Sequence, residues 1–369
     1  MPIVNRMAEL HDEITQWRRE IHSNPELMYD VHETAAGVAE KLKAFGCDEV
    51  HTGIGRTGVV GIIHGKSQSS GHVVGMRADM DALPIEEATD KPYKSKVPGK
   101  MHACGHDGHT AMLLGAAKYL SETRNFDGTV AVIFQPAEEG GAGGKAMVDD
   151  GMMDRFNIQE VYGMHNMPGL PVGEFAIRSG PIMAATDEFT ITVSGKGAHA
   201  AMPHEGIDPI VATAQIVSAL QNIVARNSDP LEPLVVSVTK FNAGSAYNVI
   251  PETAEIAGTV RSLSLDSRNE ALKRIDEIVN SIAVAHGATA SISFRSGYPA
   301  TVNHEEGAQK AAAIASEIAG VDKVYTDRRP SMGGEDFSYM LLERPGAFIF
   351  MGNGESAGLH HPKYDFNDE

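Results

Sequence analysis

Residues of the types that bind metal ions in proteins are concentrated in four short segments of this chain. A lone histidine is most often a surface or core residue with satisfied hydrogen bonds. Four such segments, each at a predicted strand end or in a predicted loop, instead predict a metal site at the carboxyl ends of the strands of an α/β sheet. The segments are Met-His-Ala-Cys-Gly-His-Asp-Gly-His at 101–109, Gln-Pro-Ala-Glu-Glu-Gly-Gly at 135–141, His165, and Leu-His-His-Pro at 359–362.

Two adjacent glutamates, Glu138 and Glu139, follow one of the predicted strands. Where the chain turns on leaving a strand, one carboxylate can bind a cation while its neighbour faces a water molecule and acts as general base. The alternative, in so acidic a chain, is a solvated acidic turn.

The chain contains only two cysteines, Cys47 and Cys104. A disulfide framework is therefore not expected, and the cytoplasm, a reducing compartment, is the predicted location. Cys104, beside His106, is more naturally a thiolate metal ligand than a disulfide partner. Cys47 has no ligand-type neighbours and is interpreted as a small buried hydrophobic residue.

Asp79 and Asp81 are spaced two apart at the end of a predicted strand and share one face of it. One of the two can accept a hydrogen bond from a ligand imidazole and fix its tautomer. The alternative is a turn or helix-capping role before Pro84.

The elements that must position these residues alternate between strand and helix, as in an α/β domain with a mixed, mostly parallel sheet. Apolar residues from Met7 to Ile21 recur at helical spacing, and Gly46 is a predicted helix C-cap. Helices are predicted at about 7–21, 33–45, 110–121 and 304–318, and strands at 58–64, 72–81, 128–134, 160–165, 172–178 and 347–351.

Residues 184–297 follow a different pattern, βαββαβ, which is the ferredoxin-like arrangement. Because α/β character resumes afterwards, this unit is predicted to be inserted into a discontinuous domain of residues 1–183 and 298–369. Its expected strands are 187–194, 234–241, 252–263 and 288–295, and its expected helices are 208–226 and 266–286.

The 369 residues include 49 acidic and 31 basic side chains, which gives a net charge of −18. This charge argues against a nucleic-acid partner. No apolar run approaches the roughly 20 residues of a membrane helix, and the first residues lack a signal-peptide core. We expect no membrane partner and a small-molecule substrate.

Two further motifs are not followed by the secondary structure that their usual functions require. Gly53–Gly58 matches a dinucleotide-binding fingerprint, but a strand follows it where a helix is required. Gly354–Gly358 matches a nucleophile elbow, but no helix can follow before Pro362 and no Asp-then-His order remains downstream. A serine hydrolase is therefore disfavoured.

Five motifs, in this order and spread over nearly the whole chain, resemble the M20 metallopeptidase family. More narrowly, they resemble its amidohydrolase branch of hippurate hydrolases, aminoacylases, N-acetyl-diaminopimelate deacetylases and auxin-conjugate hydrolases. The motifs are Met-Arg-Ala-Asp-Met-Asp-Ala-Leu-Pro (76–84), Met-His-Ala-Cys-Gly-His-Asp-Gly-His (101–109), Gln-Pro-Ala-Glu-Glu-Gly (135–140), Gly-Lys-Gly-Ala-His-Ala-Ala-Met-Pro-His (195–204) and Leu-His-His-Pro (359–362).

The resemblance implies a two-metal catalytic domain with a smaller inserted lid, often used for dimerisation, so a homodimer or homotetramer is expected. It implies that Glu138 is the general base and that Asp81 is the carboxylate that orients a ligand. His102 and His109 are expected to surround the ligands without binding metal. The metal ligands implied by the motifs are Cys104, His106, Glu139, His165 and His360.

Five ligands are too many for one catalytic zinc ion and suit two cations about 3.5 to 4 Å apart. A thiolate can bridge them, but the wider family more often has a bridging aspartate where this branch has the cysteine. The bridging ligand therefore stays open. Zinc and manganese both fit the ligand types, with nickel or cobalt as further alternatives.

The leading hypothesis is hydrolysis of the amide bond of N-acyl amino acids, of the hippurate or N-acetyl type. The same machinery would serve a metallo-dipeptidase or exopeptidase. A third alternative is a catalytically silent metal- or ligand-binding protein, against which the pair Glu138 and Glu139 argues.

The resemblance also implies that residues of the inserted unit meet the substrate. His199 is a candidate donor to the oxyanion that forms on attack. Arg261 and Asn248 are candidate partners for the substrate carboxylate. The alternative is structural: an ion pair for Arg261, a turn for Asn248 and a backbone cap for His199.

Overall fold

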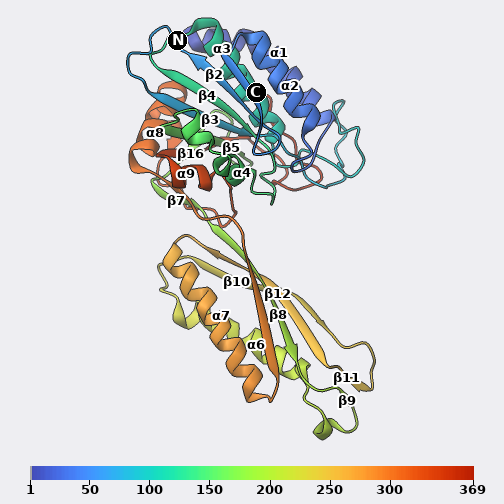
Figure 1. Cartoon of the computed structure of the whole chain (residues 1–369). Coiled ribbons are helices and arrows are strands. Elements are labelled where there is room, and N and C mark those ends of the chain that lie inside the picture. Colours follow the sequence, from blue (N-terminus) through green and yellow to red (C-terminus); the bar gives the residue numbers. More distant parts are fainter. Residues whose placement is uncertain (1) are drawn as a thin grey trace. The chain divides into compact units, whose positions relative to one another are not determined.

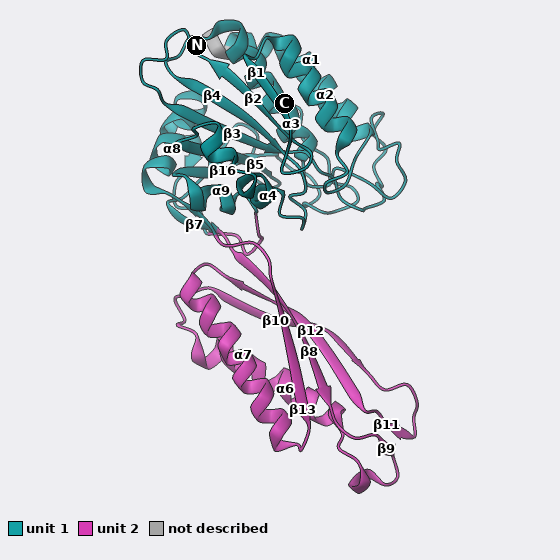
Figure 2. Ribbon diagram, viewed as in Figure 1, with its two compact units in different colours: residues 1–182, 301–329, 336–369 teal, residues 183–300, 330–335 magenta. Residues whose placement is uncertain are grey.

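The computed structural model describes residues 2–369, which fold into two units, each with its own core (Figure 2). Unit 1 contains the chain up to residue 182 together with 301–329 and 336–369, and unit 2 contains 183–300 and 330–335. The sequence analysis expected the inserted unit at 184–297, and the short segment 330–335, which it did not assign to that unit, also belongs to unit 2. Among the described residues, no helix has the length and apolar character needed to cross a membrane.

Unit 1 is built on an eight-stranded mixed sheet, as predicted (Figure 1). Its centre, β4-β3-β5-β16, is parallel, and β1 and β2 extend it with antiparallel pairing. In sheet order the strands are β1 (Glu49–Ile54), β2 (Gly58–His64), β4 (Thr129–Gln135), β3 (Val73–Asp79), β5 (Glu160–Met167), β16 (Gly346–Gly352), β6 (Phe175–Ala176) and β15 (Val324–Tyr325).

Three helices bury the main core of unit 1 against this sheet. Trp17 from α1 (Pro2–Ser23), Leu42 from α2 (His32–Phe45) and Leu114 from α3 (His106–Thr123) pack with Phe134 of β4. The predicted C-cap Gly46 has a left-handed conformation, with φ 82°. A separate core joins α8 (Glu305–Ala319) to β16.

Unit 2 has the predicted βαββαβ order and an antiparallel sheet in the order β10-β12-β8-β13. Its core packs α6 and α7 on this sheet through residues such as Phe189, Ile216 and Ile275. The elements are β8 (Ala185–Ser194), α6 (Pro209–Asn222), β10 (Leu234–Ala243), β12 (Thr253–Ser262), α7 (Leu265–Ala285) and β13 (Thr289–Ser296).

Several short elements were not predicted. The strand expected at 172–178 is only the two-residue β6, and the chain beyond it forms small ladders between β7 (Gly180–Met183) and β14 (Thr301–Asn303), and between β9 (Ala198–His199) and β11 (Val249–Ile250). The remaining helices are α4 (Gly143–Asp149), α5 (Met152–Arg155) and α9 (Ser338–Glu343), with single turns at Pro203–Glu205, Ile223–Asn227 and Val321–Lys323.

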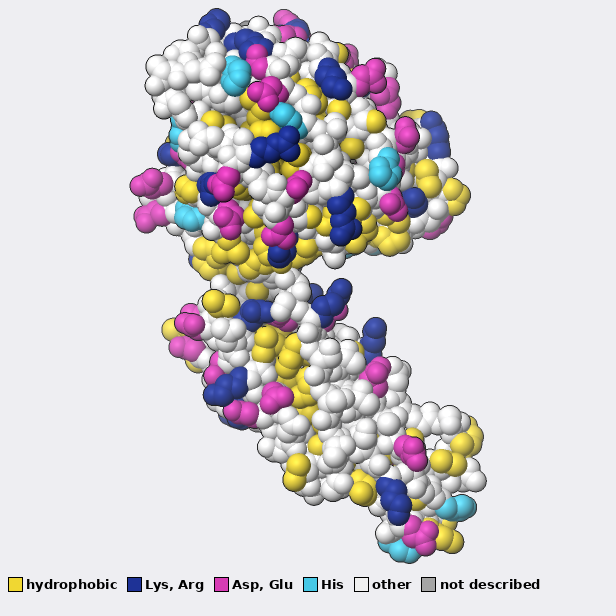
Figure 3. All heavy atoms as spheres, viewed as in Figure 1, with side chains coloured by type: hydrophobic (Ala, Val, Ile, Leu, Met, Phe, Trp, Pro, Cys, Tyr) yellow, Lys and Arg dark blue, Asp and Glu magenta, His cyan; other side chains and the backbone are white. Residues whose placement is uncertain are grey.

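On the face in view in Figure 3, acidic and basic side chains are interspersed, and hydrophobic side chains lie among them. This distribution differs from the basic stripe that a nucleic-acid interface presents.

Candidate metal centre

The carboxyl ends of neighbouring parallel strands bring the predicted site segments together. Asp79 ends β3 and pairs with Gln135 at the end of β4, while His165 lies near the end of β5, which pairs with β3 on its other side. Parallel strands end at the same edge of a sheet, where such folds place their active sites. The segments that follow Asp79 and Gln135 therefore begin side by side, close to His165.

The segment from Cys104 to His106 enters α3 through a glycine turn. The sequence predicted this helix from residue 110, but it begins at His106, so that His106 and His109 lie one turn apart on one side of the helix. Gly105 has φ 93°, and a Cβ atom there would lie 2.3 Å from Asn166 Oδ1. Only glycine fits both constraints, so this turn fixes the directions of Cys104 and His106.

The two glutamates follow β4 in a turn that Asp81 holds. Ala137 has φ 53°, a left-handed conformation that turns the chain as it leaves the strand. The backbone N–H groups of Glu138 and Glu139 donate to the two carboxylate oxygens of Asp81 over 2.9 and 3.1 Å. Beyond this turn, Glu139 Oε1 lies 3.2 Å from His360 Nε2.

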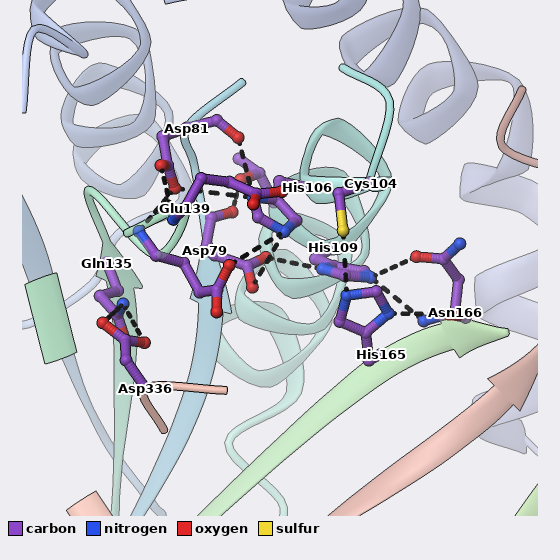
Figure 4. A network of polar contacts seen from close by, with 12 residues as sticks. Asp79, Asp81, Cys104, His106, His109, Gln135, Glu139, His165, Asn166 and Asp336 are labelled. Atoms are coloured by element: carbon purple, nitrogen blue, oxygen red, sulfur yellow. Dashed lines mark hydrogen bonds and ion pairs between the residues drawn. The ribbon is translucent and has the colours of Figure 1, made fainter. Parts of the chain in front are cut away.

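All five residues that the family resemblance implied as metal ligands come together in unit 1. Figure 4 shows four of them, Cys104, His106, Glu139 and His165. They form two groups, Cys104 with His106 and His165, and Cys104 with Glu139 and His360. In each group the candidate ligand atoms lie within 4.8 Å of one another. Cys104 is common to both, and its Sγ lies 3.5 Å from His165 Nε2.

Glu138, the predicted base, lies beside these groups. It is buried, and its Oε2 is 4.0 Å from His106 Nε2. Glu138, Glu139 and His106 form a further set of closely spaced ligand atoms. The carboxylate of Glu138 can therefore reach a group bound between the ligands.

The structure separates the contributions of Asp79 and Asp81, which the sequence had left open. The Nδ1–H of His106 donates to the backbone carbonyl of Asp81 over 2.8 Å, and the Asp81 carboxylate is 3.6 Å away. Asp79 instead binds His109 Nδ1 through Oδ1 over 2.6 Å. The imidazole of His106 is thus oriented mainly by a main-chain oxygen, which leaves Nε2 directed at the other ligands.

The electrostatics of this cluster favour cations. Burial disfavours the charged form of His106, but Asp79 and Asp81 outweigh this effect and raise its pKa to about 10. Burial, reinforced by Glu139 and Glu138, raises the pKa of the Cys104 thiol well above its usual range. Cys104 and His106 therefore retain their protons, and metal ions that bind to these side chains would displace the protons.

One buried polar atom among the candidate ligands lacks a hydrogen-bond partner in the described part of the chain. This atom is His106 Nε2. A thiol, three imidazoles and a carboxylate are also the donor set that zinc-type metals prefer. These residues fit a metal centre. His102, expected nearby, is buried with both ring nitrogens likewise without a partner among the described residues.

The predicted substrate-binding residues all belong to unit 2, which brings two of them together. His199 in β9 pairs with Val249, the residue after Asn248, and the N–H of Ala200 donates to the carbonyl of Asn248. Arg261 lies eight residues from Thr253 along β12, a span of about 26 Å at roughly 3.3 Å per residue. His199 and Asn248 are exposed, and Arg261 is half-buried.

Several residues around the ligands were not identified from sequence. Arg77 binds Asp79 Oδ2 over 2.7 Å and Asp336 Oδ1 over 3.0 Å. The side chain of Asn166 lies between His109 and Tyr364. Two of them carried a signal in the sequence, Arg77 through its place in the motif 76–84 and Asn166 through its position directly after the candidate ligand His165. The fold brings Asp336 and Tyr364 near.

Comparison with known proteins identifies the family. A model of peptidase family M20/M25/M40 matches residues 75–369. The chain is 42% identical to the hippurate hydrolase of Campylobacter jejuni, covering 100% of this chain and 95% of the relative. It is 45% identical to thermostable carboxypeptidase 2 of Saccharolobus solfataricus, covering 98% of this chain and 91% of the relative.

A solved structure agrees with these relatives. It is the crystal structure of the YxeP protein of Bacillus subtilis, described as a dinuclear metal binding peptidase from the M20 family. The two chains are 36% identical, with a TM-score of 0.85 and coverage of 98% of this chain and 94% of that one. The chain belongs to peptidase family M20/M25/M40.

Proposed function

We propose that the protein is a metal-dependent amidohydrolase that cleaves the amide bond of N-acyl amino acids, releasing a carboxylate and a free amino acid. The observation that carries the proposal is the pair of three-ligand groups that share Cys104, with Glu138 beside them. The full-length similarity to a hippurate hydrolase supports the substrate class, because hippurate is N-benzoylglycine.

We propose two divalent metal ions at this centre, with zinc or manganese as the first choices and nickel or cobalt as alternatives. His106 and His165 would hold one ion and Glu139 and His360 the other, and Cys104 would contribute to both groups of ligands. Bound metal ions would polarise the amide carbonyl and make water more acidic. The likeness to a dinuclear M20 peptidase supports the number of ions.

Glu138 is the proposed general base. Its carboxylate takes a proton from the attacking water and then delivers this proton to the leaving nitrogen, so that the products are a carboxylate and an amine. Asp81 serves the same step indirectly. Its carboxylate binds the N–H groups of Glu138 and Glu139 and so fixes the position of the base relative to a metal ligand.

The proposed substrate contacts come from unit 2. His199 would donate to the oxyanion, and Asn248 and Arg261 would bind the substrate carboxylate. His199 pairs with Val249, which precedes β12, whereas Arg261 lies near the far end of that strand. The part of β12 from Thr253 to Arg261 alone spans about 26 Å, which is longer than one small substrate. We therefore propose a homodimer or homotetramer in which His199 of one copy serves the centre of another.

A carboxypeptidase activity is the second candidate, favoured by the 45% identity to the Saccharolobus enzyme. Both activities require a substrate with a free carboxylate. They differ at the other side of the scissile bond, where a dipeptide carries a free amine and an N-acyl amino acid carries an uncharged acyl group.

The test measures amine release from N-acetyl, N-benzoyl, N-succinyl and indole-acyl amino acids and from unblocked dipeptides. The protein is first stripped with a chelator and then reloaded with manganese or zinc. We expect acyl amino acids to be cleaved only after reloading, and faster than the dipeptides. Faster cleavage of dipeptides would establish the second candidate, and no cleavage of any substrate by the reloaded protein would refute both.

A further inference from the structure

Asn166 occupies a buried position between several parts of the metal centre, although no motif singled it out. It follows His165 in β5 and is fully buried. The Nδ1–H of His165 donates to the backbone carbonyl of Asn166 over 2.7 Å. This bond fixes the ring so that Nε2 faces Cys104 Sγ at 3.5 Å.

The side chain of Asn166 is held at both ends. Its Oδ1 lies 2.8 Å from Nε2 of His109, and its Nδ2 donates to the hydroxyl of Tyr364 over 2.5 Å. His109 is anchored in turn by Asp79 at its other ring nitrogen. These side chains are buried, so each lost contact leaves an unpaired polar group that water cannot reach.

The side-chain amide of Asn166 also packs against the turn that contains the candidate ligands Cys104 and His106. A Cβ atom on Gly105 would lie 2.3 Å from Asn166 Oδ1 and 2.7 Å from Tyr364 Oη. The amide and the hydroxyl therefore pack directly on the backbone between Cys104 and His106. Their removal would leave a space into which this turn can relax.

We propose that Asn166 is a positioning residue of the metal centre, which holds His165 through its backbone and the turn from Cys104 to His106 through its side chain. The inference rests on the two-metal centre proposed above. It assigns Asn166 mainly to the metal ion held by His106 and His165, because Asn166 accepts a hydrogen bond from His165 and its side-chain hydrogen bonds in the described part of the chain go to His109 and Tyr364. Loss of the amide should then affect one of the two metal sites more than the other.

The test is a metal titration of stripped protein, followed by calorimetry and by the absorption of the cobalt-loaded form. For Asn166→Ala we expect one of two equivalents to bind about 10- to 100-fold more weakly, the usual loss when a group that supports a metal ligand is removed. The thiolate-to-cobalt absorption band should weaken or shift. Asn166→Asp keeps an oxygen facing His109 and one facing Tyr364, so it should retain both equivalents.

Asn303→Ala is the matched control. Asn303 is also a buried asparagine of unit 1 with several hydrogen bonds, to Arg178 and Phe348, and none of its hydrogen bonds within the described residues goes to a candidate ligand. We expect this variant to lose stability and to bind both equivalents as the wild type does. If Asn166→Ala does not fold, Tyr364→Phe removes only the hydroxyl partner of the amide and should weaken the same equivalent by a smaller factor.

The outcomes separate this inference from the proposed function. A wild-type protein that binds fewer than two equivalents would refute the two-metal centre and the inference with it. Two equivalents in the wild type, with unchanged affinities and an unchanged cobalt spectrum in both Asn166→Ala and Tyr364→Phe, would refute the inference alone. Equal weakening of both equivalents would refute the assignment of Asn166 to one site.

Discussion

His22 makes the stability of unit 1 depend on pH. It is buried on α1, with Nδ1 2.8 Å from Asp107 and Nε2 3.4 Å from Glu87. Burial disfavours its charged form, but Asp107 and Glu87 outweigh this effect and raise its pKa to about 9. In the unfolded chain the value is about 6.5.

The folded state therefore binds a proton more tightly than the unfolded state. The stabilisation is complete below about pH 6.5 and is lost as the pH rises through about 9. The difference of about 2.5 between the two pKa values, at about 1.4 kcal/mol for each tenfold change in proton affinity, gives about 3 kcal/mol. Arg18, 3.4 Å from Asp107, remains charged throughout this range.

The assay compares urea unfolding of the wild type and His22→Gln between pH 6 and 10, both without divalent metal. We expect the stability advantage of the wild type to shrink by about 3 kcal/mol over this range. Arg19→Gln, an exposed change on the same helix, should show no such trend against the wild type. An advantage constant to within about 0.5 kcal/mol would show that His22 is not held as a cation by Asp107 and Glu87.

Three further substitutions test the assigned roles. Glu138→Gln should keep its metal but lower turnover at least 10²-fold on N-benzoylglycine; activity within a few-fold of wild type would remove Glu138 from the role of base. Cys104→Ser should lose metal on dialysis, because a neutral hydroxyl replaces a thiolate, and a full metal complement would contradict its role as a ligand. Arg261→Ala should lower kcat/KM for acyl amino acids and scarcely affect amino-acid amides, which lack the carboxylate; equal losses on both would exclude carboxylate recognition.

The gathering of the candidate ligands could be predicted because ligand-type residues repeat next to predicted strand ends. Cys104, His106 and Glu139 stand in dense motifs whose composition alone separates them from structural residues. His165 and His360 are weaker signals, noted as candidate ligands from their positions, and the family resemblance then implied their roles as ligands. The start of α3 was predicted late, at residue 110, because His106 and Gly108 have poor helix propensity. Tertiary contacts compensate, since Phe366 packs directly over Gly108.

The supporting residues were less predictable because their partners are distant in sequence. Arg77 is a charged residue inside a strand, and it becomes meaningful only when the fold places Asp336 within 3.0 Å of it. The importance of Asn166 likewise depends on Tyr364, which the chain supplies nearly two hundred residues later. Local patterns report periodicity and local chemistry, whereas these contacts depend on the packing of the complete unit.

The charge balance of the centre explains why these supporting groups are needed. Asp79, Asp81 and Glu139 are carboxylates in a buried region, where isolated negative charges are costly. Arg77 offsets part of this cost by pairing with Asp79, and His106 offsets more as long as it retains its proton. Burial and the nearby glutamates raise the pKa of the Cys104 thiol, so that it keeps its proton in the absence of metal. Two divalent cations would replace the proton of His106 and allow the thiol to ionise. Metal uptake should therefore release protons from the same side chains that bind the ions. The buried carboxylates need positive charge beside them, and either protons or metal ions supply it.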